Sequence, residues 1–164
     1  MGGLKERSHE STEIFWSDAP CVLWKPGLEK FRKGLTLVPP HEQAKARNDF
    51  GIAETCYLHF QSVANQIRFC RKRQELRTAT GEDRADVAAQ MTSIAEKEIE
   101  LAMRQYKIAK KDSRIAYEAS NHYYYRPLDL IEKVLNCKYL IRKLASVVGG
   151  PSTNKYQHPL PIRW

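Results

Sequence analysis

The chain has 164 residues, of which 42% are hydrophobic, 8 are glycine and 8 are proline, a composition that fits one globular domain and excludes a fibrous repeat or a mainly disordered chain. Its formal net charge of +8 at pH 7 raises the question of an acidic partner such as nucleic acid. Charged residues interrupt every apolar run, which excludes a membrane-spanning helix, and the polar start MGGLKERSHE has no signal-peptide pattern, so we expect a cytoplasmic protein.

The N-terminal part of the chain predicts one short helix. Residues 1–19 show no hydrophobic period, and we expect an irregular segment there. A helix is then predicted over residues 26–37, where apolar side chains recur at helical spacing until two prolines end the pattern. The apolar residues are Leu28, Phe31 and Leu35, and the prolines are Pro39 and Pro40.

A long helix is predicted next, from about Pro40 in its first turn to residue 78. Gly51 is its weak point, because glycine is unfavourable in a helix interior, and we expect a bend there. The stripe that we expect to face the core has the spacing of one helix face. It consists of Ile52, Cys56, Phe60, Val63, Ile67 and Cys70.

A second long helix is predicted over residues 83–112. Every seven residues a large apolar residue is followed by alanine, a pattern typical of a helix that lies close against a neighbour. The five pairs are Val87-Ala88, Ile94-Ala95, Leu101-Ala102, Ile108-Ala109 and Ile115-Ala116. Because the connection to the preceding helix is short, we expect the two to pair as an antiparallel hairpin.

The last predicted helix begins at Pro127 and ends at the glycine pair 149–150. Its expected core face consists of Leu128, Ile131, Leu135, Tyr139 and Leu144. An extended tail with three prolines follows over 149–164. The sequence thus predicts an all-α fold, an antiparallel bundle of three to four helices with one long helical hairpin, in a domain spanning residues 20–148.

No metal site, cofactor site or independent active site is expected. The four cysteines lack metal-ligand spacing, and we expect buried free thiols at Cys21, Cys56, Cys70 and Cys137. Neither HExxH nor a pair of Glu-x-x-His motifs occurs. Glu118, Ser120 and His122 lie close in sequence, but nothing marks a nucleophile turn or an oxyanion hole.

The segment SRIAYEASNHYYYRP, residues 113–127, concentrates hydrogen-bonding side chains between two predicted helices. One interpretation is structural, with polar residues capping helix ends and tyrosine rings covering the end of the bundle. The other is a binding surface for a sugar or a second domain, since Tyr and Arg dominate interface hot spots. Its candidate ligand-binding residues are Arg114, Glu118, Asn121, His122, Tyr123, Tyr124, Tyr125 and Arg126. Candidate polar neighbours on the long second helix are His59, Asn65, Gln66 and Arg68.

Two stretches, DSRIAYEASNHYYYRPLDLIEKVLNCKYL and GIAETCYLHFQSVANQIRF, resemble the C-terminal helical region of large, mostly uncharacterised bacterial proteins. In those proteins this region follows a hexosaminidase-like glycoside hydrolase barrel. The resemblance implies a non-catalytic helical accessory domain, or a fragment, that contacts a carbohydrate or a catalytic barrel through residues 114–126. Glu118 has no evident second carboxyl partner of the kind that glycoside hydrolysis needs, so no catalytic residue is carried over. A face that meets a barrel in the larger proteins would favour self-association when it is uncovered.

The alternative is a basic helical-hairpin module that binds an acidic protein or nucleic acid. Its candidate residues are Arg71, Lys72, Arg73 and Arg77. These cations lie near a predicted helix C-terminus, where they also complement the helix dipole. No nucleic-acid-binding motif accompanies them, and we therefore favour the accessory domain.

Overall fold

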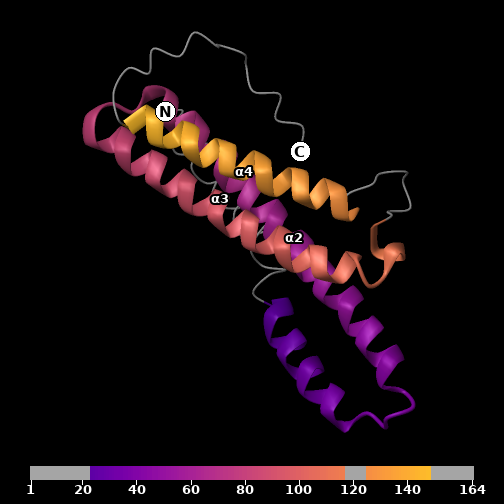
Figure 1. The fold of residues 1–164 in the computed structure, drawn as a ribbon. Helices are drawn as coiled ribbons and strands as arrows, with labels where there is room; N and C mark the ends of the chain where they lie inside the picture. The colour runs from indigo at the N-terminus through magenta and orange to yellow at the C-terminus, as the bar shows by residue number, and fades with distance from the viewer. Residues whose placement is uncertain (1–22, 117–124, 149–164) are drawn as a thin grey trace.

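The computed structural model describes residues 23–116 and 125–148 (Figure 1). Over these ranges all regular structure is helical, which confirms the predicted all-α bundle. A helix over residues 23–34 comes first, and the remaining elements are η1 (Leu35–Leu37), α2 (Gln43–Thr78), α3 (Gly81–Ala109), η2 (Ser113–Ala116) and α4 (Pro127–Val148). The expected N-terminal segment 1–19 and tail 149–164 lie outside the described residues. No described helix is long and apolar enough to cross a lipid bilayer.

Two tight turns set the limits of α2. Pro40 was expected in its first turn, but the helix begins at Gln43, because Pro39 accepts a turn hydrogen bond from the Glu42 amide at 3.0 Å. The connection to α3 is only two residues long, and α3 opens at Gly81 with a φ of 56°, a conformation that favours glycine. This short turn forces α2 and α3 to run antiparallel, as the sequence predicts.

Figure 1 shows α2, α3 and α4 packed side by side, while the helix of residues 23–34 and the first half of α2 extend away from them. That first helix is held to α2 by aromatic contacts. The Trp24 indole donates a hydrogen bond to the Ala53 carbonyl at 3.0 Å, and the Phe31 ring lies edge-on to Phe50. The chain therefore forms a second, smaller hairpin beside the predicted long one.

The alanine seam of α3 lies at the centre of the bundle. Ala88, Ala95, Ala102 and Ala109 are between 1% and 3% exposed. Small side chains let neighbouring backbones approach closely, and here the seam meets both neighbours. One cluster joins Ala88 and Met91 to Phe69 of α2 and Leu144 of α4, and another joins Ala102 and Ala109 to Leu130 of α4. The expectation that α2 would be the partner of the seam was therefore incomplete. The fifth pair of the repeat, Ile115-Ala116, lies beyond α3 in η2.

The predicted core face of α4 was largely wrong. The buried residues of this helix are Leu130, Cys137 and Leu144. Four of the five residues expected inside are exposed instead: Leu128 by 72%, Ile131 by 44%, Leu135 by 59% and Tyr139 by 45%. Helix α4 thus has two apolar faces, and only one of them packs in the bundle.

The predicted core stripe of α2 was also misplaced. Ile52 is 47% exposed, and Cys70 lies at the surface. The buried residues of α2 are Leu58, Ser62, Ala64, Asn65 and Phe69. Two of these five are polar, and a search for apolar periodicity could not find a face that contains them.

Replacing Gly51 with alanine tests the role of this glycine inside α2. Helix α2 continues through Gly51, and a Cβ added there would meet only the Ile108 Cγ2 atom, at 3.5 Å, which is an ordinary contact. We expect Gly51→Ala to raise the free energy of unfolding by about 0.5–1 kcal/mol, because alanine loses less backbone entropy in a helix. Urea denaturation followed by circular dichroism measures this change. A destabilised variant would show that close packing against α3 requires the glycine.

Candidate functional site

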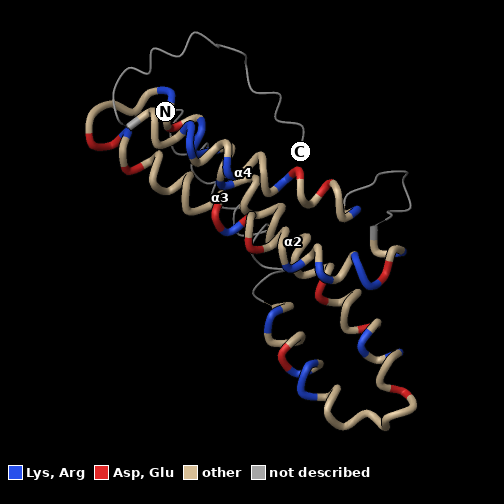
Figure 2. Tube along the Cα trace, in the orientation of Figure 1, with Lys and Arg blue, Asp and Glu red and all other residues tan. Residues whose placement is uncertain are grey.

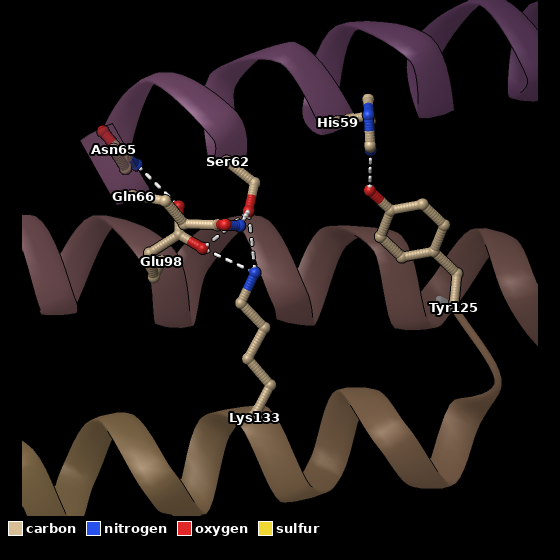
Figure 3. A network of polar contacts seen from close by, with 7 residues as sticks. All are labelled: His59, Ser62, Asn65, Gln66, Glu98, Tyr125 and Lys133. Carbon is tan, nitrogen blue, oxygen red and sulfur yellow. Dashed lines mark hydrogen bonds and ion pairs between the residues drawn. The ribbon is translucent and has the colours of Figure 1, made fainter. Parts of the chain in front are cut away.

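A buried polar network joins the three packed helices (Figure 3). At its centre is the carboxylate of Glu98 on α3, which is 2% exposed. It accepts hydrogen bonds from Asn65 at 2.7 Å and Ser62 at 2.9 Å, both on α2, and forms an ion pair with the Lys133 ammonium of α4 at 2.6 Å. A buried charge is tolerated only when it is paired and hydrogen-bonded. The three donors therefore stabilise the Glu98 carboxylate in the position that it occupies.

A second layer of contacts orients these donors. Ser62 Oγ accepts hydrogen bonds from Lys133 at 2.8 Å and from Gln66 at 3.2 Å. Asn65 Oδ1 accepts one from Arg68 at 3.2 Å. Three of the four candidate polar neighbours predicted on α2 therefore belong to this network rather than to a solvated surface.

The combination of Ser62, Lys133 and Glu98 has the composition of a nucleophile with an adjacent base. Ser62 is 5% exposed and Glu98 is 2% exposed, so the hydroxyl lies inside the helix interface, where a substrate has no access. We therefore assign the network a structural role. In the ranges that the structure describes, no group of three His, Cys, Asp or Glu side chains is placed to hold a metal ion.

The thiol of Cys137 lies beside the network. Burial raises the pKa of this thiol to about 11, and the nearby Glu98 carboxylate adds to the effect. Because the thiolate is the reactive form, Cys137 is an inert packing residue. The expectation of buried thiols is confirmed for Cys137, whereas Cys56 is half-buried and Cys70 is exposed; Cys21 lies outside the described residues.

Three of the eight predicted ligand-binding residues lie in the described part of the chain: Arg114, Tyr125 and Arg126. The other five, Glu118, Asn121, His122, Tyr123 and Tyr124, lie outside it. Arg114 is exposed and forms a two-point pair with Asp112, at 2.9 and 2.7 Å. This hydrogen bonding lowers the pKa of the Asp112 carboxyl and raises that of Arg114. Arg126 forms a similar pair with Asp129, at 3.0 and 3.1 Å.

Tyr125 connects the end of the polar segment to the bundle. Its hydroxyl is hydrogen-bonded to Nδ1 of His59 on α2, and its ring lies edge-on to the imidazole with centroids 5.9 Å apart (Figure 3). The Tyr125 ring also packs on the cluster formed by Ala102, Ala109 and Leu130. The structure thus places His59 next to the polar segment, as predicted, through Tyr125, which lies two residues before α4 begins at Pro127.

A shallow, open depression of about 590 Å³ lies where α3 ends and α4 begins. Its lining combines an aromatic ring, two cations, a hydroxyl and an apolar floor: Tyr106, Lys110, Ser113, Arg126, Ala109, Pro127 and Leu128. The Lys110 ammonium lies 5.6 Å from the centroid of the Tyr106 ring. Among the residues that the structure describes, Arg126 is the one predicted ligand-binding residue in the lining, and Ser113 directly precedes Arg114.

The sequence patterns did not single out Tyr106 of the depression, nor Ser62, Glu98 and Lys133 of the buried network. A usable signal for the network was present in α3. The alanine seam is one position of a heptad repeat, and the other position is occupied by Met91, Glu98 and Gln105, all of which are 2% exposed. Polar residues at a core position of a heptad indicate a specific partner, and Gln105 also has one, because its amide donates to Thr55 Oγ1 at 3.2 Å.

Comparison of the chain with protein-family models, with curated proteins and with solved structures finds no match. The resemblance to the helical region of glycoside hydrolase-like proteins therefore stays a prediction.

The chain offers a matched pair of ion pairs for testing the network. Lys133–Glu98 and Lys72–Glu75 both have nitrogen–oxygen distances of 2.6 Å, but the side chain of Glu98 is 2% exposed and that of Glu75 is 48% exposed. We expect Lys133→Met to lower the free energy of unfolding by about 3 kcal/mol, because it leaves a buried carboxylate without its cation. The matched control Lys72→Met should change it by less than about 1 kcal/mol.

Urea denaturation of both variants, followed by circular dichroism, gives the two values. Equal changes in the two variants would contradict a structural role for the Glu98 network.

Proposed function

We propose that this chain is a non-catalytic helical accessory domain that contacts a carbohydrate, or a catalytic barrel that acts on one, through residues 114–126. The observation that carries the proposal is the depression lined by Tyr106, Lys110, Ser113 and Arg126. It lies at the two ends of the polar segment, which supplies Ser113 from one side and Arg126 from the other.

The chemistry of the depression suits a sugar. Binding sites for small ligands combine an apolar lining with a few polar groups that set orientation, and the amphipathic Tyr106 ring offers both a face and a hydroxyl. The two-point pair with Asp129 favours one orientation of the Arg126 guanidinium, so less side-chain freedom is lost when Arg126 donates to a ligand. Further contacts are expected from Glu118, Asn121, His122 and the tyrosines of the segment.

A non-catalytic role is supported by the state of the buried network. Ser62, Glu98 and Lys133, which have the composition of a nucleophile with an adjacent base, are engaged with one another inside the helix interface. The groups at the depression are donors and a ring, which suit recognition.

Titration with an N-acetylglucosamine tetrasaccharide, followed by isothermal calorimetry, tests the carbohydrate contact. We expect Tyr106→Ala and Arg126→Ala each to weaken binding about tenfold, because one removes the ring and the other a charged hydrogen-bond donor. Tyr124→Ala and Glu118→Gln should act in the same direction. Lys97→Ala, which removes an exposed charge in the middle of α3, is the control and should leave affinity unchanged.

Binding that survives both Tyr106→Ala and Arg126→Ala would show that the depression is not the binding site. If the wild-type chain does not bind the tetrasaccharide, the catalytic barrel is the remaining proposed partner.

A second candidate function, the binding of a polyanion, is favoured by the arrangement of basic residues. Figure 2 shows Lys and Arg along the whole trace, including the end of the bundle where α2 and α4 end. Phe69 and Leu144 share a core cluster, which brings two basic stretches together. They comprise Arg68, Arg71, Lys72, Arg73 and Arg77 of α2, and Lys138, Arg142 and Lys143 of α4.

Salt dependence separates this candidate from sugar binding. Counterion release makes the affinity for nucleic acid fall steeply with salt, so binding of a fluorescent DNA duplex should weaken strongly between 50 and 200 mM salt, on the order of tenfold or more. Fluorescence anisotropy measures it, and replacing Arg73 and Arg77 with alanine should reduce the slope. A salt-independent affinity would rule this candidate out.

A further inference from the structure

The outer face of α4 has no partner among the described residues. Leu128, Ile131, Leu135 and Tyr139 are each between 44% and 72% exposed. They recur at intervals of three, four and four residues, so they form one stripe that is about 17 Å long. Figure 1 shows α4 at the edge of the bundle. We call these four residues the outer stripe.

The inward face of α4 fixes the direction of the outer stripe. Lys133 reaches Glu98 at 2.6 Å, and Leu130, Cys137 and Leu144 on the same side of the helix are buried. The outer stripe is therefore a second apolar face that rotation of α4 cannot bury without breaking the ion pair. Contiguous exposed apolar surface of this kind marks an interaction site.

The charges beside the outer stripe have a definite order along the helix. Glu132 lies in the first half of α4, and Lys138, Arg142 and Lys143 lie in the second half. Glu132 and Arg142 are both exposed. The Lys143 ammonium lies over the Tyr139 ring at 5.4 Å, so the cationic half also borders the stripe.

We propose that the outer stripe binds the same stripe of a second copy of this chain, with the two α4 helices antiparallel. A two-fold axis near the level of residue 137 places Leu135 opposite Tyr139 of the second copy, since the two positions are equidistant from the axis. The same axis places Glu132 of each copy opposite Arg142 of the other copy, which gives two such pairs. The contact is isologous and closed, as most homodimer interfaces are.

Charge order selects this arrangement over its alternatives. In a parallel pair, Glu132 would face Glu132 and Arg142 would face Arg142, and like charges placed opposite each other are strongly unfavourable. The antiparallel pair brings Glu132 level with Arg142 twice. Lys138 lies next to Lys138 of the second copy in either arrangement, so the preference for the antiparallel pair comes from the Glu132–Arg142 contacts. Among the described residues, the outer stripe and the depression overlap at Leu128 alone.

Sedimentation equilibrium of the purified full chain tests the proposal. The wild-type chain should reach a mass of twice 19.0 kDa as concentration rises. Leu135→Glu should weaken the dimer at least about tenfold, because it places a charge at the centre of the apolar contact. Met103→Glu is the matched control: Met103 is 54% exposed on α3, outside the stripe, and its replacement should leave the dimer intact.

Charge exchange tests the direction of the two helices. Glu132→Arg alone and Arg142→Glu alone should each weaken the dimer about tenfold, and the double variant should restore it, because the antiparallel pairing is regenerated with the signs exchanged. Circular dichroism verifies that every variant keeps its helix content. The residues involved lie outside the sugar-binding assignment, so tetrasaccharide affinity should be unaffected by either single change.

A wild-type chain that stays monomeric at all concentrations would overturn the proposal. The outer stripe would then be a binding surface for a different protein. A dimer that tolerates Leu135→Glu would overturn it too, because the contact would then lie elsewhere. Failure of the double variant to recover would overturn the antiparallel arrangement.

Discussion

The buried carboxylate of Glu98 is the constraint on which the bundle depends. At 2% exposure it has no access to bulk water, and the cost of burying an unpaired charge is several kcal/mol. Donors from two other helices offset this penalty: Ser62 and Asn65 of α2, and Lys133 of α4. Apolar contacts alone would tolerate small rotations and shifts of the helices. Hydrogen bonds at 2.6–2.9 Å do not, and they hold α2, α3 and α4 in one register.

The orientation of α4 follows from that constraint. Lys133, Leu130 and Cys137 share one side of the helix, so directing the Lys133 ammonium to Glu98 also buries the two apolar residues. The same rotation turns the outer stripe to the surface. The Lys133–Glu98 ion pair therefore determines which apolar face of α4 is available to a partner. One orientation of α4 about its axis both forms the internal network and exposes the stripe of the proposed dimer.

The same packing separates the candidate functions in space. The depression lies where α3 ends and α4 begins, and the Tyr125–His59 contact anchors this end of the bundle. The basic stretches of the polyanion candidate, which include Arg73 and Arg77 of α2 and Arg142 of α4, lie toward the other end of α4. Helix α4 reaches from one end of the bundle to the other. Substitutions at one end can therefore be compared with substitutions at the other end. Substitutions at Tyr106 and Arg126 therefore test the carbohydrate contact without touching the basic residues at the end of α2, whereas the polyanion alternative and the proposed dimer share Arg142.

The sequence by itself determined the helices and most of their limits, because local signals carry that information: Pro127 begins α4 as predicted, and the helix predicted over 83–112 is α3, Gly81–Ala109. The alanine heptads also identified the central seam correctly, since small residues repeated every seven positions are typical of a helix in close contact with a neighbour. Only the tertiary structure decided which faces of α2 and α4 are inside. Apolar periodicity assumes that a core face is apolar, and the α2 face contains Ser62 and Asn65 because Glu98 needs their donors. Helix α4 has two apolar faces, and the ion pair between Lys133 and Glu98 determines which of them is buried. The two residues are 35 positions apart in the sequence, so no local pattern encodes their contact.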